Sequence, residues 1–214
     1  MTRLQIALDT CCMEDALRPL AQAEPHIDII ECGTVLIIAE GLRAVREIRA
    51  LYPDKTILAD VRIAEAGAKI SRMCFEAGAS WVSCVAGASL TTIEQVVKVA
   101  KEYNGEVQVE LGETYDADRA RAWAQLGVKH VIVKRSRDLE AAGTLTWSDK
   151  DIERVKELAD MGFTITVTGG IKHGELEVFK GAPIGVVIAG RTIVNADDPA
   201  ESAKALQAEI HSIK

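Results

Sequence analysis

The sequence predicts a (β/α)8 barrel, a TIM barrel, formed by a single domain over residues 1–214. Short apolar segments alternate with segments of helical spacing through eight units, and no linker interrupts the series. Such alternation is typical of a parallel sheet with helical crossovers. Eight units in 214 residues make a barrel near the small end of its size range. A doubly wound open sheet is the alternative, but it rarely needs eight regular repeats.

The predicted strands are short apolar segments, most of which end at a charged residue or a glycine. They cover residues 4–8, 27–30, 56–59, 81–85, 107–109, 130–133, 163–167 and 184–189. The predicted helices lie between them, and several are closed by Pro53, Gly78, Gly127 or Gly162. They cover residues 13–23, 41–52, 64–77, 91–103, 116–126, 149–161, 175–179 and 199–213.

Composition and charge argue against several classes of protein. With 48% hydrophobic residues, the chain can bury one core but is short for two domains. The net charge is −7 and the basic residues do not cluster, so we expect neither nucleic acid nor a membrane as a partner. No apolar segment approaches the roughly 18 residues that span a bilayer, and no signal peptide is visible. The five cysteines form no C-x-x-C pair, which is typical of reduced thiols in the cytoplasm.

Charged residues follow five of the predicted strands directly, namely Asp9, Glu31, Asp60, Glu110 and Lys134. In a barrel all five positions face the mouth formed by the carboxyl ends of the strands, so their side chains should converge. The third predicted strand is followed by three charged residues, Asp60, Arg62 and Glu65. Their side chains can bind a divalent cation or an oxyanion, or they can pair with each other. The alternative is a solvated helix start in which Arg62 pairs with Glu65.

Two glycine-containing turns follow the last two predicted strands. Thr168-Gly169-Gly170 comes after the seventh strand, and Gly190-Arg191 comes after the eighth. In many barrels these two loops and the start of a short helix bind a phosphate group. Glycine lets backbone N–H groups approach the oxygens, and arginine adds a forked cationic donor. The sequence therefore predicts a phosphate site here, although ordinary tight turns are the alternative.

Seven segments together resemble the 3-keto-L-gulonate-6-phosphate decarboxylases of the orotidine monophosphate decarboxylase suprafamily, which are close to the hexulose-6-phosphate synthases. The segments are LQIALD at 4–9, DIIECGT at 28–34, SRMCFEAGA at 71–79, EVQVEL at 106–111, RSRD at 135–138, TITVTGG at 164–170 and IAGR at 188–191. The resemblance covers the whole chain. It implies a Mg²⁺-dependent sugar-phosphate lyase that forms a homodimer and acts in a pathway of the L-ascorbate utilisation type.

The resemblance also implies roles for individual residues. Glu31 and Asp60 would hold Mg²⁺, and Asp9 would contact the substrate. Glu110, Arg137 and Thr168 would line the sugar pocket. Gly170, Gly190 and Arg191 would bind the phosphate. Glu65 would reach from one subunit into the site of its partner.

Three catalytic positions depart from the family pattern. The motif Asp-x-Lys-x-x-Asp reads here as Asp60-x-Arg62-x-x-Glu65, and the histidine of His-Arg-Ser-Arg-Asp is Lys134. In the family the lysine stabilises an enediolate and the histidine helps to deliver a proton through water. Arginine does not donate a proton at neutral pH, and lysine is a weaker acid than histidine. Three hypotheses remain: the same decarboxylation, aldol or isomerase chemistry on the same enediolate, and non-catalytic binding of a sugar phosphate.

Overall fold

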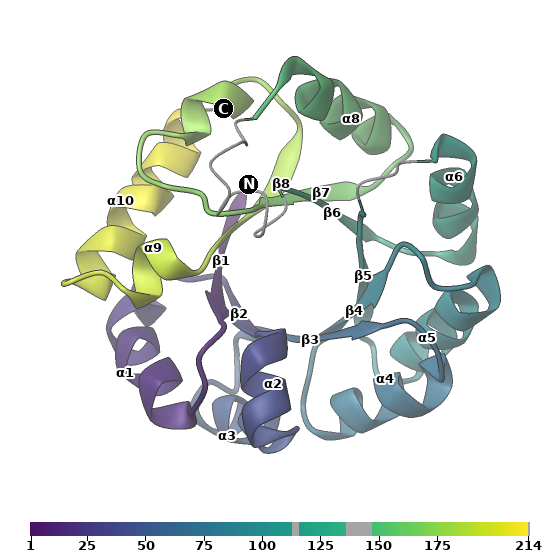
Figure 1. The fold of residues 1–214 in the computed structure, drawn as a ribbon, viewed down its shortest axis with the longest axis horizontal. Coiled ribbons are helices and arrows are strands. Elements are labelled where there is room, and N and C mark those ends of the chain that lie inside the picture. Colours follow the sequence, from purple (N-terminus) through teal and green to yellow (C-terminus); the bar gives the residue numbers. More distant parts are fainter. Residues whose placement is uncertain (113–115, 136–146, 214) are drawn as a thin grey trace.

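The computed structural model describes residues 1–112, 116–135 and 147–213. Its eight strands are all parallel and close into a barrel in sequence order, from β1 round to β8, which pairs again with β1. Figure 1 looks into this barrel and shows the helices as an outer ring. The predicted (β/α)8 fold is confirmed. The strands are β1 Arg3–Leu8, β2 Ile29–Cys32, β3 Thr56–Ile63, β4 Trp81–Val85, β5 Glu106–Glu110, β6 His130–Lys134, β7 Thr164–Thr168 and β8 Ile184–Ala189.

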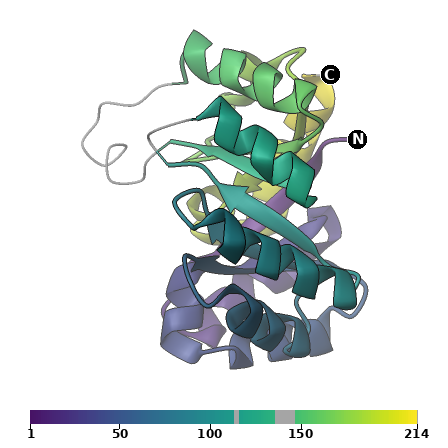
Figure 2. The same ribbon diagram turned by 90° about the vertical axis from the view of Figure 1, so that its right-hand side faces the viewer.

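The helices lie beside the strands, and Figure 2 shows this packing from the side of the barrel. The longer ones are α1 Met13–Ala23, α3 Arg43–Leu51, α4 Gly67–Glu76, α5 Leu90–Glu102, α6 Ala117–Leu126, α8 Asp149–Asp160 and α10 Pro199–Ser212. Four shorter elements are α2 Thr34–Glu40, α9 Arg191–Val194 and the 3-10 helices η1 Glu24–His26 and η2 Leu176–Phe179. No helix in the described ranges is long and apolar enough to cross a membrane.

Two helices that follow strands directly were not predicted. The segment of α2 is TVLIIAE, an apolar run too short to show a helical period. Gly41, at φ 63°, separates α2 from α3. Helix α9 has only four residues after Gly190. Both helices therefore begin at the mouth of the barrel, next to predicted site residues.

Strand β3 is longer than predicted, because it continues past Ala59 to Ile63. Its pairing with β4 shifts register between Ala59 and Ile63, so this part of the strand contains a bulge. Arg62 lies in the bulge with a left-handed backbone at φ 47°. Asp60 and Arg62 thus belong to a strand, and the alternative of a solvated helix start is wrong.

The alternation of side chains along each strand explains how acids reach the interior of the mouth. A buried apolar cluster contains Ile29 of β2, Leu58 of β3 and Ile132 of β6. Successive side chains of a strand point to opposite faces, so residues two positions apart share a face. Glu31, Asp60 and Lys134 each lie two residues beyond a member of this cluster. The same pleat that fills the barrel with apolar side chains therefore directs these charges into its mouth.

Candidate functional site

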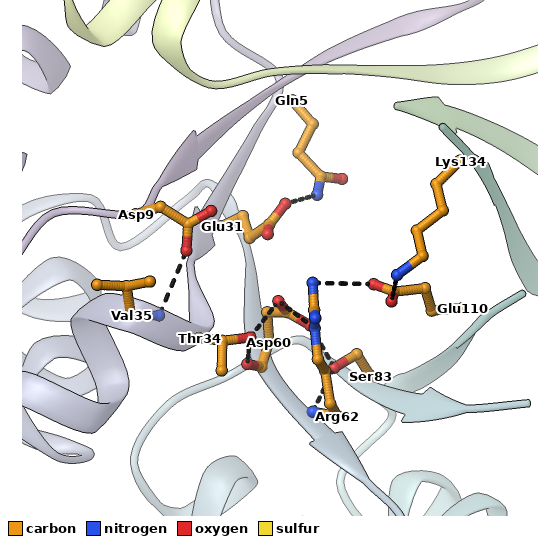
Figure 3. A network of polar contacts seen from close by, with 10 residues as sticks. All are labelled: Gln5, Asp9, Glu31, Thr34, Val35, Asp60, Arg62, Ser83, Glu110 and Lys134. Carbon is orange, nitrogen blue, oxygen red and sulfur yellow. Dashed lines mark hydrogen bonds and ion pairs between the residues drawn. The ribbon is translucent and has the colours of Figure 1, made fainter. Parts of the chain in front are cut away.

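Six charged side chains gather at the mouth of the barrel, as Figure 3 shows. Five of them lie in strands β2, β3, β5 and β6, and one follows β1. The six are Asp9, Glu31, Asp60, Arg62, Glu110 and Lys134. The convergence expected of charges at the strand ends is therefore present. Glu31, Asp60, Glu110 and Lys134 lie inside the strands as assigned in the structure, and only Asp9 follows one.

The carboxylate of Asp60 is fixed by hydrogen bonds on both oxygens. Thr34 Oγ1 donates to Oδ2 at 2.6 Å, and Ser83 Oγ donates to Oδ1 at 2.6 Å. Arg62 Nε lies 3.4 Å from Oδ2. Ser83 also accepts a hydrogen bond from the backbone N–H of Arg62 at 2.8 Å. Ser83 therefore orients the carboxylate and holds the bulge that places Arg62.

Glu31 is the most strongly perturbed acid of the site. Its side chain is buried, and its one described hydrogen bond comes from Gln5 Nε2 to Oε2 at 2.5 Å. Burial raises the pKa of Glu31 well above its usual value, and the neighbouring carboxylates of Asp60 and Asp9 raise it further. Desolvation and repulsion both favour the neutral form. A cation placed among these acids would relieve both effects.

Glu110 lies between the two cations of the mouth. Lys134 Nζ donates a hydrogen bond to Oε1 of Glu110, and Arg62 Nη2 lies 3.3 Å from Oε2. Partial burial lowers the pKa of Arg62, but attraction to Glu110, Asp60, Asp9 and Glu31 outweighs this and raises it above its usual value. Arg62 therefore remains a cation that bridges Asp60 and Glu110, with 43% of its side chain exposed.

Asp9 follows β1, and its side chain contacts the first turn of helix α2. Its Oδ1 accepts a hydrogen bond from the backbone N–H of Val35 at 3.3 Å. Gly33 makes this approach possible, because a Cβ atom at that position would overlap Oδ1 of Asp9. The unpredicted helix α2 thus positions two site groups, since Thr34 contacts Asp60 and Val35 contacts Asp9.

The acids of the mouth have the chemistry to hold Mg²⁺, which takes oxygen ligands and often binds one or two carboxylates together with water or substrate. Four acids and two cations leave an excess of negative charge when all are ionised, and repulsion from Asp60 and Asp9 adds to the effect of burial in raising the pKa of Glu31. Glu31 and Asp60 would be the ligands. Among the residues that the structure describes, no group of three or more His, Cys, Asp or Glu side chains is arranged to hold a metal.

The two predicted phosphate loops lie close together. Gly169 and Gly170 have φ of 113° and 62°, conformations that glycine adopts without strain. A Cβ at Gly190 would lie 3.3 Å from the backbone oxygen of Ala7. Thr192, next to Arg191, donates a hydrogen bond from Oγ1 to the carbonyl of Ile171 at 2.5 Å. Thr168 ends β7 and Arg191 begins α9, so all four predicted residues of this region border the same loops.

Two predicted site residues are not part of this cluster. Glu65 is exposed in the segment between β3 and α4, and its predicted role across a subunit interface stays a prediction. Arg137 lies outside the residues that the structure describes. The site assignments as a whole remain predictions that the arrangement of the side chains supports.

Four supporting residues were not predicted. Gln5, Thr34 and Ser83 hold the acids, and Arg135 holds the β7 loop through hydrogen bonds from Nε to the carbonyl of Gly169 and from Nη2 to Glu175. Arg135 is buried and also lies over the Trp147 ring. The polar side chains of Gln5 and Ser83 within apolar strands were a usable signal, because buried polar groups need partners.

Comparison with known proteins agrees with the resemblance. Residues 2–206 match the model of the Orotidine 5'-phosphate decarboxylase / HUMPS family. The chain is 47% identical to the 3-keto-L-gulonate-6-phosphate decarboxylase UlaD of Escherichia coli O17:K52:H18 (strain UMN026 / ExPEC) over 207 residues, which are 97% of this chain and 95% of the relative.

Solved structures show the same similarity. KGPDC from Streptococcus mutans, crystallised in complex with a ligand, superposes with a TM-score of 0.96 at 37% identity, covering 99% of this chain and 98% of that one. The 3-hexulose-6-phosphate synthase from Salmonella typhimurium gives 0.92 at 29% identity, covering 100% of both chains. The decarboxylase names agree with the predicted enzyme class, a carbon–carbon lyase. The chain belongs to the Orotidine 5'-phosphate decarboxylase / HUMPS family.

Proposed function

We propose that the protein catalyses the Mg²⁺-dependent decarboxylation of 3-keto-L-gulonate 6-phosphate to L-xylulose 5-phosphate through an enediolate. The observation that carries this proposal is the arrangement of Glu31 and Asp60 beside Arg62 at the mouth of the barrel. The names of relatives of 46–47% identity support the choice of substrate. The proposed pathway is one of the L-ascorbate utilisation type.

Loss of CO₂ from a β-keto acid leaves negative charge on the enediolate oxygens, and the site must stabilise it. Bound Mg²⁺ would neutralise this charge as a Lewis acid. Arg62 supplies a second positive charge, fixed by the β3 bulge and by its contacts with Asp60 and Glu110. Donors that are already oriented toward developing charge contribute strongly to catalysis. One carboxylate oxygen of Glu110 forms an ion pair with Arg62 and keeps the guanidinium in place.

The enediolate must then take up a proton. Arg62 is a poor donor because a guanidinium does not lose its proton at neutral pH. Lys134 is the other cation of the mouth, and its ammonium group donates a hydrogen bond to Glu110. We therefore assign Lys134 as the group that supplies the proton, directly or through water, and Glu110 as the group that orients it.

The phosphate group lies far from the reacting carbon in the substrate. The backbone N–H groups around Gly170 and Gly190, with the guanidinium of Arg191, would bind it. Binding energy gained there can hold the sugar in the reactive orientation at the other end of the mouth.

A second candidate is aldol or isomerase chemistry on the same enediolate. The similarity to 3-hexulose-6-phosphate synthase favours it, together with the replacement of the family lysine and histidine by Arg62 and Lys134. The third candidate, non-catalytic binding of a sugar phosphate, would suit a site that Arg62 fills. The exposed fraction of the Arg62 side chain, 43%, favours a group that solvent and substrate reach.

The test is CO₂ release from 3-keto-L-gulonate 6-phosphate with and without Mg²⁺, for the parent and an Arg62→Ala variant. We expect release by the parent, loss on metal removal, and a decrease of about 10²–10³ in kcat for the variant, the range seen when one charge-stabilising donor is removed. Arg46→Ala is the matched control, because Arg46 is exposed on α3 and is not one of the six charged residues of the mouth.

Other outcomes would point to the other candidates. Sugar-phosphate binding without CO₂ release would reject decarboxylation, and aldol and isomerase substrates would then be screened. Equal activity of the parent and Arg62→Ala would remove Arg62 from the mechanism. Binding with no turnover of any of these substrates would favour the non-catalytic candidate.

A further inference from the structure

The loop after β7 is held near its start by Arg135 and further along by helix α10. At its start, Arg135, the residue after β6, donates a hydrogen bond from Nε to the carbonyl of Gly169 at 2.8 Å. Further along, His173 and Gly174 contact helix α10. The residues between these points, including Gly170, are those expected to present N–H groups to a phosphate.

His173 is held at both ring nitrogens. Its Nδ1 lies 3.3 Å from Glu209 Oε1, and its Nε2 lies 3.0 Å from Ser202 Oγ. The other oxygen of Glu209 accepts a hydrogen bond from the backbone N–H of Gly174 at 2.9 Å. Glu209 therefore contacts both the side chain of one loop residue and the backbone of the next, which fixes the loop in one position on α10.

Ser202 connects the same ring to the loop after β8. Its Oγ donates a hydrogen bond to the carbonyl of Thr192 at 2.7 Å, and Thr192 Oγ1 donates to the carbonyl of Ile171. Thr192 follows Arg191, the predicted phosphate-binding arginine. The contacts thus form a closed circuit that joins both predicted phosphate loops through His173.

The order Glu209, His173, Ser202 has the composition of a hydrolase triad, but the geometry argues against nucleophilic catalysis. A serine hydroxyl has one proton, and Ser202 donates it to the carbonyl of Thr192. His173 therefore acts as a donor to Ser202 and does not act as its base. Ser202 is also buried, with 8% of the residue exposed, so a substrate does not reach its oxygen.

We propose that His173 is a positioning residue for the phosphate group of the substrate, held by Glu209 and Ser202 so that the β7 and β8 loops keep one spacing. The inference rests on the proposed function in one respect, that these loops bind phosphate. Gly169 and Gly170 leave the loop backbone with wide conformational freedom, so anchors outside the loop must supply the order. His173 does not contact the reacting carbon in this proposal, and its effect should appear in binding.

The experiment compares the parent with His173→Ala and Glu209→Gln. The parent and each variant are measured for KM and kcat with the sugar phosphate, for the dissociation constant of inorganic phosphate by calorimetry, and for the melting temperature. Loss of one or two hydrogen bonds should weaken phosphate binding about three- to tenfold in His173→Ala. KM should rise by the same factor while kcat changes less than twofold. His211→Ala is the control, because His211 is exposed on α10, the helix that carries Glu209.

Glu209→Gln tests the circuit if His173→Ala does not fold, because its amide keeps an acceptor for Gly174 and has nearly the same size. We expect it to weaken phosphate binding less than His173→Ala does. Unchanged phosphate affinity in both variants would overturn the inference, and so would a parent that does not bind phosphate. Because calorimetry does not require turnover, a parent that binds phosphate but releases no CO₂ would reject the proposed reaction and leave this inference standing.

Discussion

At the scale of single residues, the acids at the mouth of the barrel outnumber the cations. Asp9, Glu31, Asp60 and Glu110 face Arg62 and Lys134, and the ion pairs of Arg62 and Lys134 use Asp60 and Glu110. Glu31 has only the neutral amide of Gln5 as its described hydrogen-bond donor. Buried carboxylates without a counter-charge are costly, so Glu31 is where a bound cation would have the largest effect.

This leads to a prediction for Glu31→Gln. Because the pKa of Glu31 is raised in the folded state, its stabilising contribution is present at low pH and is lost as pH rises through that pKa. At pH 7.5 without metal, the variant should therefore melt above the parent, and the difference should shrink as pH falls toward 4.5. Each kcal/mol corresponds to about 2–4 °C for a chain of this size.

Mg²⁺ should raise the melting temperature of the parent and leave that of Glu31→Gln nearly unchanged, since ligand binding stabilises the folded state. Differential scanning calorimetry with and without Mg²⁺ measures both effects. Glu153→Gln, an exposed change on α8, is the control and should keep the parent's response. An equal response to Mg²⁺ in Glu31→Gln would show that Glu31 is not a ligand.

Lys134 gives a second prediction at this scale, about the pH dependence of the reaction. If Lys134 supplies the proton, Lys134→Ala should lower kcat by about 10²–10⁴, the usual contribution of a general acid. Lys134→His should restore part of the rate, but its activity should fall as pH rises above about 6.5, where imidazole loses its proton. The parent has no imidazole at this position, so its profile should not show this loss.

The measurement is a pH profile of kcat for the parent, Lys134→Ala and Lys134→His. Arg62 and Glu110 are unchanged in all three, so the comparison isolates the donor. Identical profiles for the parent and Lys134→His would mean that another group delivers the proton.

At the scale of secondary-structure elements, β3 and α2 together build the part of the site around Asp60 and Arg62. The bulge of β3 turns Arg62 toward the mouth, and its backbone N–H is held by Ser83 of β4. A left-handed backbone at a non-glycine residue costs about 1–2 kcal/mol. The surrounding contacts with Ser83, Asp60 and Glu110 must offset this cost, which is typical of strain kept at functional sites.

The contact between α4 and α5 gives a prediction about stability. Gly67 begins α4, and a Cβ there would lie 2.6 Å from the backbone oxygen of Thr92 and 2.9 Å from Val96 Cγ2, both on α5. Gly67→Ala should destabilise the protein by about 1–3 kcal/mol, as overpacking does, although alanine is the better helix former. Urea unfolding measures the change.

Gly87→Ala is the matched control, because no atom lies within 4 Å of a Cβ at that position and its backbone is not left-handed. Its stability should stay within about 0.5 kcal/mol of the parent. A similar loss of stability in both variants would mean that the close approach of α4 to α5 is not the cause in Gly67→Ala.

At the scale of the whole molecule, the sequence was sufficient for the barrel and for the residues at its mouth. Periodicity and strand-end charges are local signals, so they predicted the eight strands and the convergence of Asp9, Asp60 and Glu110. They did not predict α2 or the β3 bulge, because a seven-residue apolar segment has no distinct period and a bulge depends on pairing with β4. Likewise, the contact of Gln5 with Glu31 depends on the pairing of β1 with β2 and is not visible in either segment alone.

The last prediction concerns assembly. We expect a homodimer in which Glu65, exposed between β3 and α4, completes the site of the partner subunit. Single variants Glu65→Ala and Asp60→Asn should each lose most activity as homodimers. When they are co-expressed, half of the dimers should pair one variant with the other, and one of the two sites in each such dimer would have both groups intact. About a quarter of the parental activity should therefore return.

If Glu65 acted within its own subunit, every site would lack one group and co-expression would restore nothing. The preparation must be shown to be dimeric by sedimentation, because a monomer that retains full activity would reject the shared site directly.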